Sequence, residues 1–319
     1  MSARSVACAA LVTVIVLGSA SCGGERLDGA DRSVPSPSVS EPSEPGAPAT
    51  SPSGQPPTPD QPSPSVADVT PTERRNTTFN TSQVPRIKGW RSDFSDSFDR
   101  GPRRQDEWEA YGYGVQRPTG GAMGVYKTSN TTIKGGTLNL RYLYRDGGWT
   151  SAGVSSRPTF HAKGGRWEFR AKFPQGQGLG YAFLLWPYDD VGPTEVNIAE
   201  GTVNGPRVHG FYHYLASAGK YDKEQRTLRV VDLTQWHTFG VILEGRTVTY
   251  TFDGEPWATV QVERVTDTPL RIAFQTGALD PDGPGAQWLG EGVPGGVPGP
   301  TTPADATIKI DWVAHYVRR

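Results

Sequence analysis

Two glutamates, Glu195 and Glu200, lie five residues apart in the short apolar segment GPTEVNIAEG, residues 192–201. A buried carboxylate is costly unless it is paired or used. If the segment is a strand, its side chains alternate, so Glu195 and Asn197 share one face. A β-bulge near Ile198–Ala199 would insert one residue and bring Glu200 to that same face.

Two carboxylates on one sheet face, with an amide between them, suit the chemistry of a retaining glycosidase. One carboxylate attacks the anomeric carbon, and the other protonates the leaving oxygen and later activates water, at a carboxyl separation of roughly 5–5.5 Å. The alternative is a pair of exposed strand acids with no chemical role. This stretch alone leaves both interpretations open.

The rest of the chain favours a β-fold that could position such a strand. Short runs of aromatic and β-branched residues recur between Gly, Pro and Asp turn signals, and no long helical period interrupts them. We expect strands within residues 136–144, 165–174, 180–187, 207–215, 236–257, 270–277 and 306–319. Many short strands in a domain of roughly 230 residues predict an all-β sandwich or barrel, with the size of a jelly roll.

The N-terminus has the pattern of an export signal. Arg4 precedes an apolar stretch, Val6–Leu17, that is short for a membrane span. Small residues then lead to Cys22, which resembles the cysteine of a bacterial lipobox, although Ser19 stands where an aliphatic residue is usual. We expect a signal peptide over residues 1–22 and an extracellular or cell-surface protein, lipid-anchored at Cys22 to the bacterial membrane. Ordinary secretion is the alternative.

Residues 23–85 are rich in Pro, Ser and Thr and have no apolar period. Such a segment cannot bury enough surface to offset its ordering entropy, so we expect a disordered linker before a folded domain at residues 86–319.

The other cysteine, Cys8, lies inside the signal, which excludes a disulfide or a Cys-based site in the folded part. The net charge of −1 and the lack of long basic runs exclude electrostatic capture of nucleic acid.

Patterns of other catalytic classes are missing from the sequence. There is no Gly-x-Ser-x-Gly elbow and no glycine-rich phosphate loop. None of the histidines has the spacing of a metal-ligand motif: His161, His209, His213, His237 and His315. We therefore expect catalysis without a cofactor.

Several segments in series resemble glycoside hydrolase family 16. TEVNIAEG is similar to the family signature Glu-x-Asp-x-x-Glu in the bulged form of laminarinase-like members, with Asn197 in place of Asp. Four further segments of this chain are similar to other strands of the family: GRWEFRAKFPQGQGLGYAFLLWP, RVHGFYHY, WHTFGVILEGRTVTYTFDGEPW and IKIDWVAHYVRR. The resemblance covers most of residues 92–319. It implies a concanavalin A-like jelly-roll β-sandwich with a concave substrate-binding sheet.

The resemblance implies roles for individual residues. Glu195 matches the family's nucleophile, and Glu200 matches its general acid/base. His213 matches the histidine of the strand after the motif, and His209 shares its parity. Asn197 cannot carry charge, but its amide can donate to a carboxylate, which favours an ionised Glu195. The loss of a negative neighbour should weaken Glu200 as an acid.

Further residues are expected around the substrate. Leu184 stands where the family usually has a cleft tryptophan, so Trp186 is the candidate stacking surface for a sugar. Trp288, at the centre of the long Gly/Pro loop of residues 279–305, could close over substrate. Gln275, in the strand before that loop, is a further substrate-binding candidate.

Together these features predict an exported, monomeric, retaining endo-glycosidase that hydrolyses a β-linked polysaccharide. The bulged motif makes a β-1,3-glucan the first expectation. Two alternatives stay open: a non-catalytic carbohydrate-binding protein on the same fold, favoured by Asn197, and a transglycosylase that remodels cell-surface glycan. The resemblance also implies a structural Ca²⁺ held partly by Asp311, in the last strand.

Overall fold

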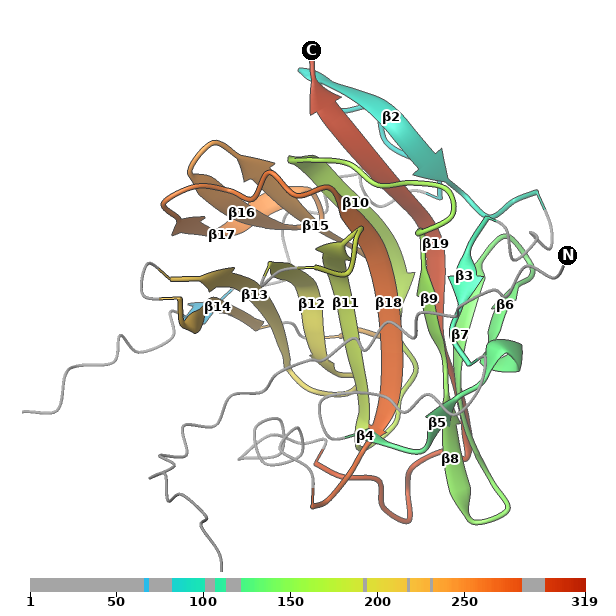
Figure 1. Ribbon diagram of the computed structural model, residues 1–319. Helices are drawn as coiled ribbons and strands as arrows, with labels where there is room; N and C mark the ends of the chain where they lie inside the picture. The colour runs from blue at the N-terminus through green and yellow to red at the C-terminus, as the bar shows by residue number, and fades with distance from the viewer. Residues whose placement is uncertain are drawn as a thin grey trace, which may run out of the picture. The chain divides into compact units, whose positions relative to one another are not determined.

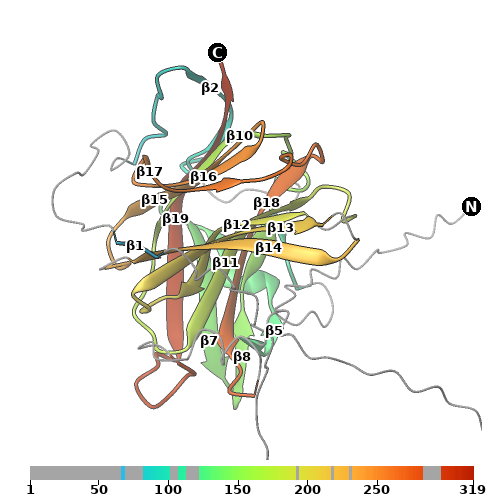
Figure 2. The same ribbon diagram turned by 90° about the vertical axis from the view of Figure 1, so that its left-hand side faces the viewer.

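The computed structural model describes residues 66–68, 82–100, 107–112, 122–191, 194–216, 219–229, 232–282 and 296–319. Regular structure in these ranges is strand, apart from a single 3₁₀ turn, η1 (Thr128–Asn130). The strands form two sheets that pack against each other (Figures 1 and 2). Within these ranges, no helix is long and apolar enough to cross a membrane.

Sheet A carries the acidic motif. Its strands pair in the order β1-β14-β13-β12-β11-β18-β9-β3, and β4 pairs with the C-terminal end of β18. Figure 1 shows β14 to β9 side by side in this order. The bounds of its strands are β1 (Val66–Asp68), β3 (Glu109–Ala110), β4 (Ala122–Met123), β9 (Gly153–Ser155), β11 (Leu179–Pro187), β12 (Glu195–Thr202), β13 (Arg207–Leu215), β14 (Tyr221–Arg229) and β18 (Leu270–Leu279).

Sheet B forms the second layer. Its strands pair in the order β17-β16-β15-β10-β19-β7-β8-β5, with β2 on β19 and β6 on β7. The bounds of its strands are β2 (Trp90–Asp96), β5 (Val125–Tyr126), β6 (Thr131–Ile133), β7 (Leu138–Arg145), β8 (Gly148–Ser151), β10 (Gly165–Lys172), β15 (His237–Glu244), β16 (Thr247–Phe252), β17 (Glu255–Gln261) and β19 (Asp305–Arg318).

The core lies between the sheets, because each strand turns alternate apolar side chains toward the other layer. Phe169 of sheet B meets two phenylalanines of sheet A edge-on, and its ring centroid is 5.3 Å from those of both Phe183 and Phe274. All three rings are buried. Since neighbouring residues on a strand point opposite ways, the residues between these core positions lie on the face of sheet A that points away from sheet B. We call it the outer face of sheet A.

A smaller apolar cluster covers the other side of sheet B. Trp312 and Tyr316 of β19 are buried in it, and the partly buried Val84 packs against them. The Tyr316 hydroxyl donates a hydrogen bond to the carbonyl oxygen of Pro85 at 3.0 Å. Residues 82–85, at the end of the expected linker, therefore lie against the domain.

The predicted fold class is confirmed: the domain is an all-β jelly-roll sandwich, and each segment expected to form strands does so. The sequence does not predict β14, because polar and charged residues dominate YDKEQRTLR. Within the expected linker, Val66–Asp68 form β1, which pairs in parallel with Thr227–Arg229 of β14. The rest of the linker before residue 82 lies outside the described residues.

Replacing Leu185 with Ala should cost about 2–5 kcal/mol of unfolding free energy, because this side chain is fully buried between the sheets. The matched control is Leu215→Ala, at a leucine that is 50 % exposed, and it should cost less than about 1 kcal/mol. Urea unfolding of both variants measures the difference. Equal losses would contradict the placement of the core.

Candidate active site

The bulge predicted from the acidic motif is present in β12. On the β11 side, the register passes from Ala199 to Asn197 and skips Ile198. On the β13 side, the three steps from Asn197 to Glu200 match only two steps of the partner strand. The extra residue resets the alternation, so Glu195, Asn197 and Glu200 all point to the outer face of sheet A.

Strand register places further polar and aromatic side chains beside the motif. Residues directly opposite each other in paired strands share a face. Glu195 lies opposite His213, and Glu200 lies opposite His209. The same face carries Phe211, Lys223, Leu184, Trp186 and Gln275 on the neighbouring strands. The site residues predicted in sheet A are therefore brought together on one surface.

The motif side chains are buried and form a short polar network. Asn197 Nδ2 donates a hydrogen bond to Glu200 Oε2 at 2.5 Å. Three buried polar atoms close to the motif have no hydrogen-bond partner among the described residues: Glu195 Oε1, Asn197 Oδ1 and Gln275 Nε2. Arg271 Nε, farther along β18 on the same face, also has none. Native proteins satisfy nearly all buried polar groups, and exceptions at one place are typical of a site that receives a polar ligand.

Burial dominates the charge state of the acidic pair. Loss of solvent, and then the negative charge of Glu200, raise the pKa of Glu195 to about 8. Burial raises the pKa of Glu200 to about 7. The Asn197 amide and the positive charge of Lys223 lower the pKa of both carboxyls, but by less than burial raises it. Burial therefore favours the protonated form of both carboxyls near neutral pH, and of Glu195 more than of Glu200, so ionisation of Glu195 depends on compensation by its neighbours.

The two histidines beside the pair are neutral. Burial is the first cause that lowers the pKa of each to about 4, in His209 and in His213. The positive charge of Lys223 acts in the same direction on both. His209 Nδ1 also lies 3.0 Å from Thr227 Oγ1. Neutral imidazoles can hydrogen-bond sugar hydroxyls without adding charge to the site.

Gln275 presents its amide nitrogen from β18. The Tyr126 hydroxyl donates to Gln275 Oε1 at 3.2 Å, which fixes the amide group with its nitrogen free of partners among the described residues. Burial raises the pKa of Tyr126, so the phenol keeps its proton and acts as a donor. The Gln275 amide is therefore oriented as a hydrogen-bond donor to a ligand.

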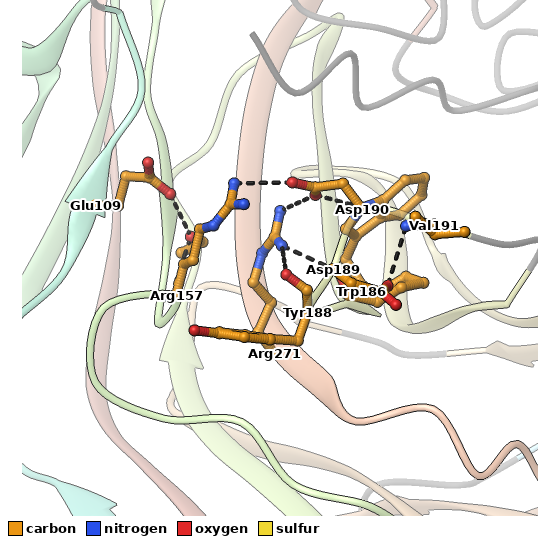
Figure 3. Close-up of polar contacts among 10 residues, drawn as sticks. Glu109, Arg157, Trp186, Tyr188, Asp189, Asp190, Val191 and Arg271 are labelled. Atoms are coloured by element: carbon orange, nitrogen blue, oxygen red, sulfur yellow. Dashed lines mark hydrogen bonds and ion pairs between the residues drawn. The ribbon is translucent and has the colours of Figure 1, made fainter. Parts of the chain in front are cut away.

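Trp186 is held by a charged network in the loop after β11 (Figure 3). Its indole Nε1 donates to Asp190 Oδ1 at 3.1 Å. Asp190 also accepts a hydrogen bond from Arg271 Nη2 at 2.6 Å and pairs with Arg157 Nη1 at 2.8 Å. Two guanidinium groups and an indole therefore converge on one carboxylate and fix the indole on the outer face.

Arg271 is the buried centre of this network. It is 1 % exposed, and its Nη1 donates to the carbonyl oxygens of Pro187 and Tyr188 at 3.0 Å each. A buried guanidinium is costly without a carboxylate, which explains the position of Asp190. No sequence pattern signals this pair, because its members are 81 residues apart.

Asp311 does not fit the calcium site that the resemblance implies. Its Oδ2 accepts a hydrogen bond from Arg170 Nη1 at 2.5 Å. A guanidinium at this position already supplies positive charge and would repel a divalent cation. Among the residues that the structure describes, no group of three or more His, Cys, Asp or Glu is placed to hold a metal.

Two predicted site residues, Trp288 and Cys22, lie outside the described residues. Conversely, the structure places Lys223 on the same face as the acidic pair. The sequence did not predict this residue as part of the site, because it did not predict the strand β14 that carries it. Lys223 lies opposite His213, and its Nζ is 5.0 Å from the centroid of the Phe211 ring. The alternation along β14 would identify its face, but only once the segment is recognised as a strand.

A jelly-roll sandwich with two buried glutamates on the outer face of one sheet has the architecture of an enzyme that cleaves glycosidic bonds. Residues 119–313 match the family model described as "Glycosyl hydrolases family 16", and this range is more than half of the chain. The chain belongs to this family of glycoside hydrolases. The family resemblance found in the sequence is thereby confirmed.

The chain is also similar to individual proteins. It is 24% identical over 171 residues to the endo-1,3-1,4-beta-glycanase EglC of Rhizobium meliloti (strain 1021). The aligned part is 53% of this chain but 33% of that protein, so the chain spans about a third of that relative's length.

Two solved structures have the same fold. The laminarinase catalytic domain from Thermotoga petrophila RKU-1 matches with a TM-score of 0.58 and 21% identity, over 73% of this chain and 100% of that chain. The endo-beta-1,3-glucanase from Pyrococcus furiosus matches with a TM-score of 0.58 and 21% identity, over 72% of this chain and 96% of that chain.

Replacing Glu195 with Gln should stabilise the protein at alkaline pH. Because the folded-state pKa is raised to about 8, the contribution of this carboxyl is fully present below the ordinary glutamate pKa and is lost as pH rises through about 8. The variant escapes this loss, so its advantage in Tm should grow to roughly 5 °C between about pH 5 and about pH 9. Thermal melts test this, with exposed Glu263→Gln as control. An advantage independent of pH would contradict the shift.

Replacing Asp190 with Asn should cost roughly 2–4 kcal/mol of stability, because it leaves the charge of Arg271 buried without a carboxylate. The control is Asp267→Asn, whose ion pair with Arg264 is exposed, and it should cost less than about 1 kcal/mol. Urea unfolding compares the two. Similar small losses would show that Arg271 does not depend on this carboxylate.

Proposed function

We propose that this protein is a retaining endo-glycosidase that hydrolyses a β-linked polysaccharide, with a β-1,3-glucan as the first substrate to test. The observation that carries the proposal is the arrangement of the acidic pair across the bulge. Glu195 has a buried oxygen without a partner among the described residues, and Glu200 has a pKa near 7. The substrate class is supported by similarity to an endo-1,3-1,4-beta-glycanase and two endo-β-1,3-glucanases.

In this mechanism Glu195 attacks the anomeric carbon through Oε1 and forms a covalent glycosyl–enzyme intermediate. Glu200 gives its proton to the glycosidic oxygen as the bond to the leaving sugar breaks. Glu200 then takes a proton from water, which attacks the same carbon and releases Glu195. Two displacements at one carbon retain its configuration.

The surrounding side chains would bind the polysaccharide. The Gln275 amide and the neutral His209 and His213 offer hydrogen bonds to hydroxyl groups, and Trp186 offers an aromatic face to a pyranose ring. These groups come from strands on both sides of β12. Binding groups on both sides of the acidic pair favour cleavage within a glycan chain over cleavage at its end.

Asn197 favours a second candidate, a non-catalytic carbohydrate-binding protein. Its amide donates to Glu200 and lowers the pKa of that carboxyl, which reduces the fraction of Glu200 that holds a proton to donate near neutral pH. A transglycosylase is a third candidate and differs in one step: a sugar hydroxyl replaces water in the attack on the intermediate. Both glutamates remain in place, which favours catalysis over simple binding.

We also propose that the protein is exported and acts as a monomer. The sequence of residues 1–22 supports a signal peptide, and Cys22 supports a lipid anchor at the outer face of the membrane. The Pro/Ser/Thr-rich segment that follows would hold the domain of residues 86–319 away from the membrane.

The test is release of reducing ends from a panel of β-1,3-glucan, mixed-linkage β-glucan, galactan and arabinogalactan. Glu195→Gln and Glu200→Gln should each reduce kcat by at least about 100-fold, and exposed Glu263→Gln should not. Binding measured by calorimetry without hydrolysis of any glycan would favour the binding protein. Elongated products would favour the transglycosylase. Full activity in either active-site variant would refute the proposed roles.

A further inference from the structure

Lys223 lies on the outer face of sheet A, two strands from the acidic motif. It is opposite His213 on β13, and His213 is opposite Glu195 on β12. Its ammonium group lies 5.0 Å from the ring centroid of Phe211, which is itself opposite Asn197. The lysine side chain therefore reaches across β13 toward the acidic pair rather than along the edge of the sheet.

Lys223 differs in its partners from the two arginines beside Trp186. Arg271 and Arg157 both pair with Asp190. None of the ion pairs formed among the described residues involves Lys223. Its charge is instead placed over an aromatic ring, where the quadrupole attracts a cation without neutralising it.

Among the described residues, the other groups near the acidic pair are neutral, paired, or act elsewhere. Arg207, on the outer face of β13, lowers the pKa of His209 but is not among the charges that shift the pKa of either glutamate. On β13, His209 and His213 are neutral above about pH 4 because they are buried. On β11, Tyr181 points into the core beneath the motif, and burial raises its pKa, so its phenol is uncharged. On β18, Gln275 is uncharged, and Arg271 is neutralised by Asp190. Among the described residues, Lys223 is the positive charge that acts on both glutamates.

The buried pair needs such a charge. A nucleophilic Glu195 must be ionised in a place from which most water is excluded, beside a second carboxyl that repels its charge. We propose that Lys223 is a positioning residue of the active site, whose charge holds Glu195 as the carboxylate that attacks the sugar. The inference rests on the proposed retaining mechanism for the role of Glu195, but the electrostatic coupling can be measured without substrate.

The direct test is a pH titration of the glutamate side-chain carboxyls by ¹³C NMR in the full chain, with signals assigned through Glu195→Gln and Glu200→Gln. Lys223→Met should raise the titration midpoints of the acidic pair by about one pH unit. Lys223→Arg, which keeps the charge, should restore midpoints close to those of the unsubstituted protein. Lys309→Met removes an exposed lysine of sheet B and should leave them unchanged. Unmoved midpoints in Lys223→Met would overturn the proposal.

Kinetics separates this inference from the proposed function. If the chain hydrolyses a glycan, the acid limb of the kcat/KM profile should move up by about one pH unit in Lys223→Met, with KM little changed. A rise in KM confined to glycans that carry acidic groups, with unmoved carboxyl midpoints, would instead identify Lys223 as a contact to the substrate and overturn the proposal. Shifted midpoints with no hydrolysis by any form would refute the proposed function and support the coupling of Lys223 to the pair.

Discussion

The removal of water from Glu195 and Glu200 is the constraint on which the rest of the site depends. Strict alternation along β12 would leave one of these side chains in the apolar layer between the sheets, where nothing could compensate its charge. The bulge avoids this by turning both to the outer face. There Asn197 lies between Leu184 and Phe211, both buried and apolar. A third carboxylate at this position would add charge where the neighbouring strands offer no hydrogen bond, whereas an amide fits.

Charged side chains of this domain are compensated in two different ways. Structural cations are neutralised by a nearby carboxylate, as in the ion pairs of Arg271 with Asp190 and Arg170 with Asp311. Such pairs add little net stability to the folded state. Removing either partner leaves the other charge buried and uncompensated, so the pair fixes the local geometry. Lys223 and the acidic pair are kept apart instead, so the charges interact without forming a salt bridge. Separation leaves the carboxyl oxygens available for chemistry.

The sequence predicted the parts of the fold and the site that depend on local pattern. Alternating apolar residues identified the core strands, and the spacing of Glu195 and Glu200 suggested the bulge, since strict alternation in a strand would put them on opposite faces. The pairing of Asp190 with Arg271 could not be predicted, because it joins segments far apart in the chain through a charge requirement that appears only after folding. The family resemblance pointed to calcium at Asp311, whereas Asp311 pairs with Arg170, which belongs to a different strand.

Strand β14 escaped prediction for a related reason. Its outward side chains face a polar site, and most of the others are exposed or only partly buried, so its composition is that of a surface loop.

The same composition has a consequence for the behaviour of the molecule in solution. β14 lies near the border of sheet A, where its one outer neighbour is the three-residue strand β1. Sheet borders with free backbone groups recruit strands from other molecules and so begin aggregation. Charged side chains along β14, including Lys223, Glu224 and Arg226, oppose such recruitment by leaving any incoming strand with charges to bury. A residue recruited for the chemistry of the site would thus also help to keep copies of the protein from joining edge to edge.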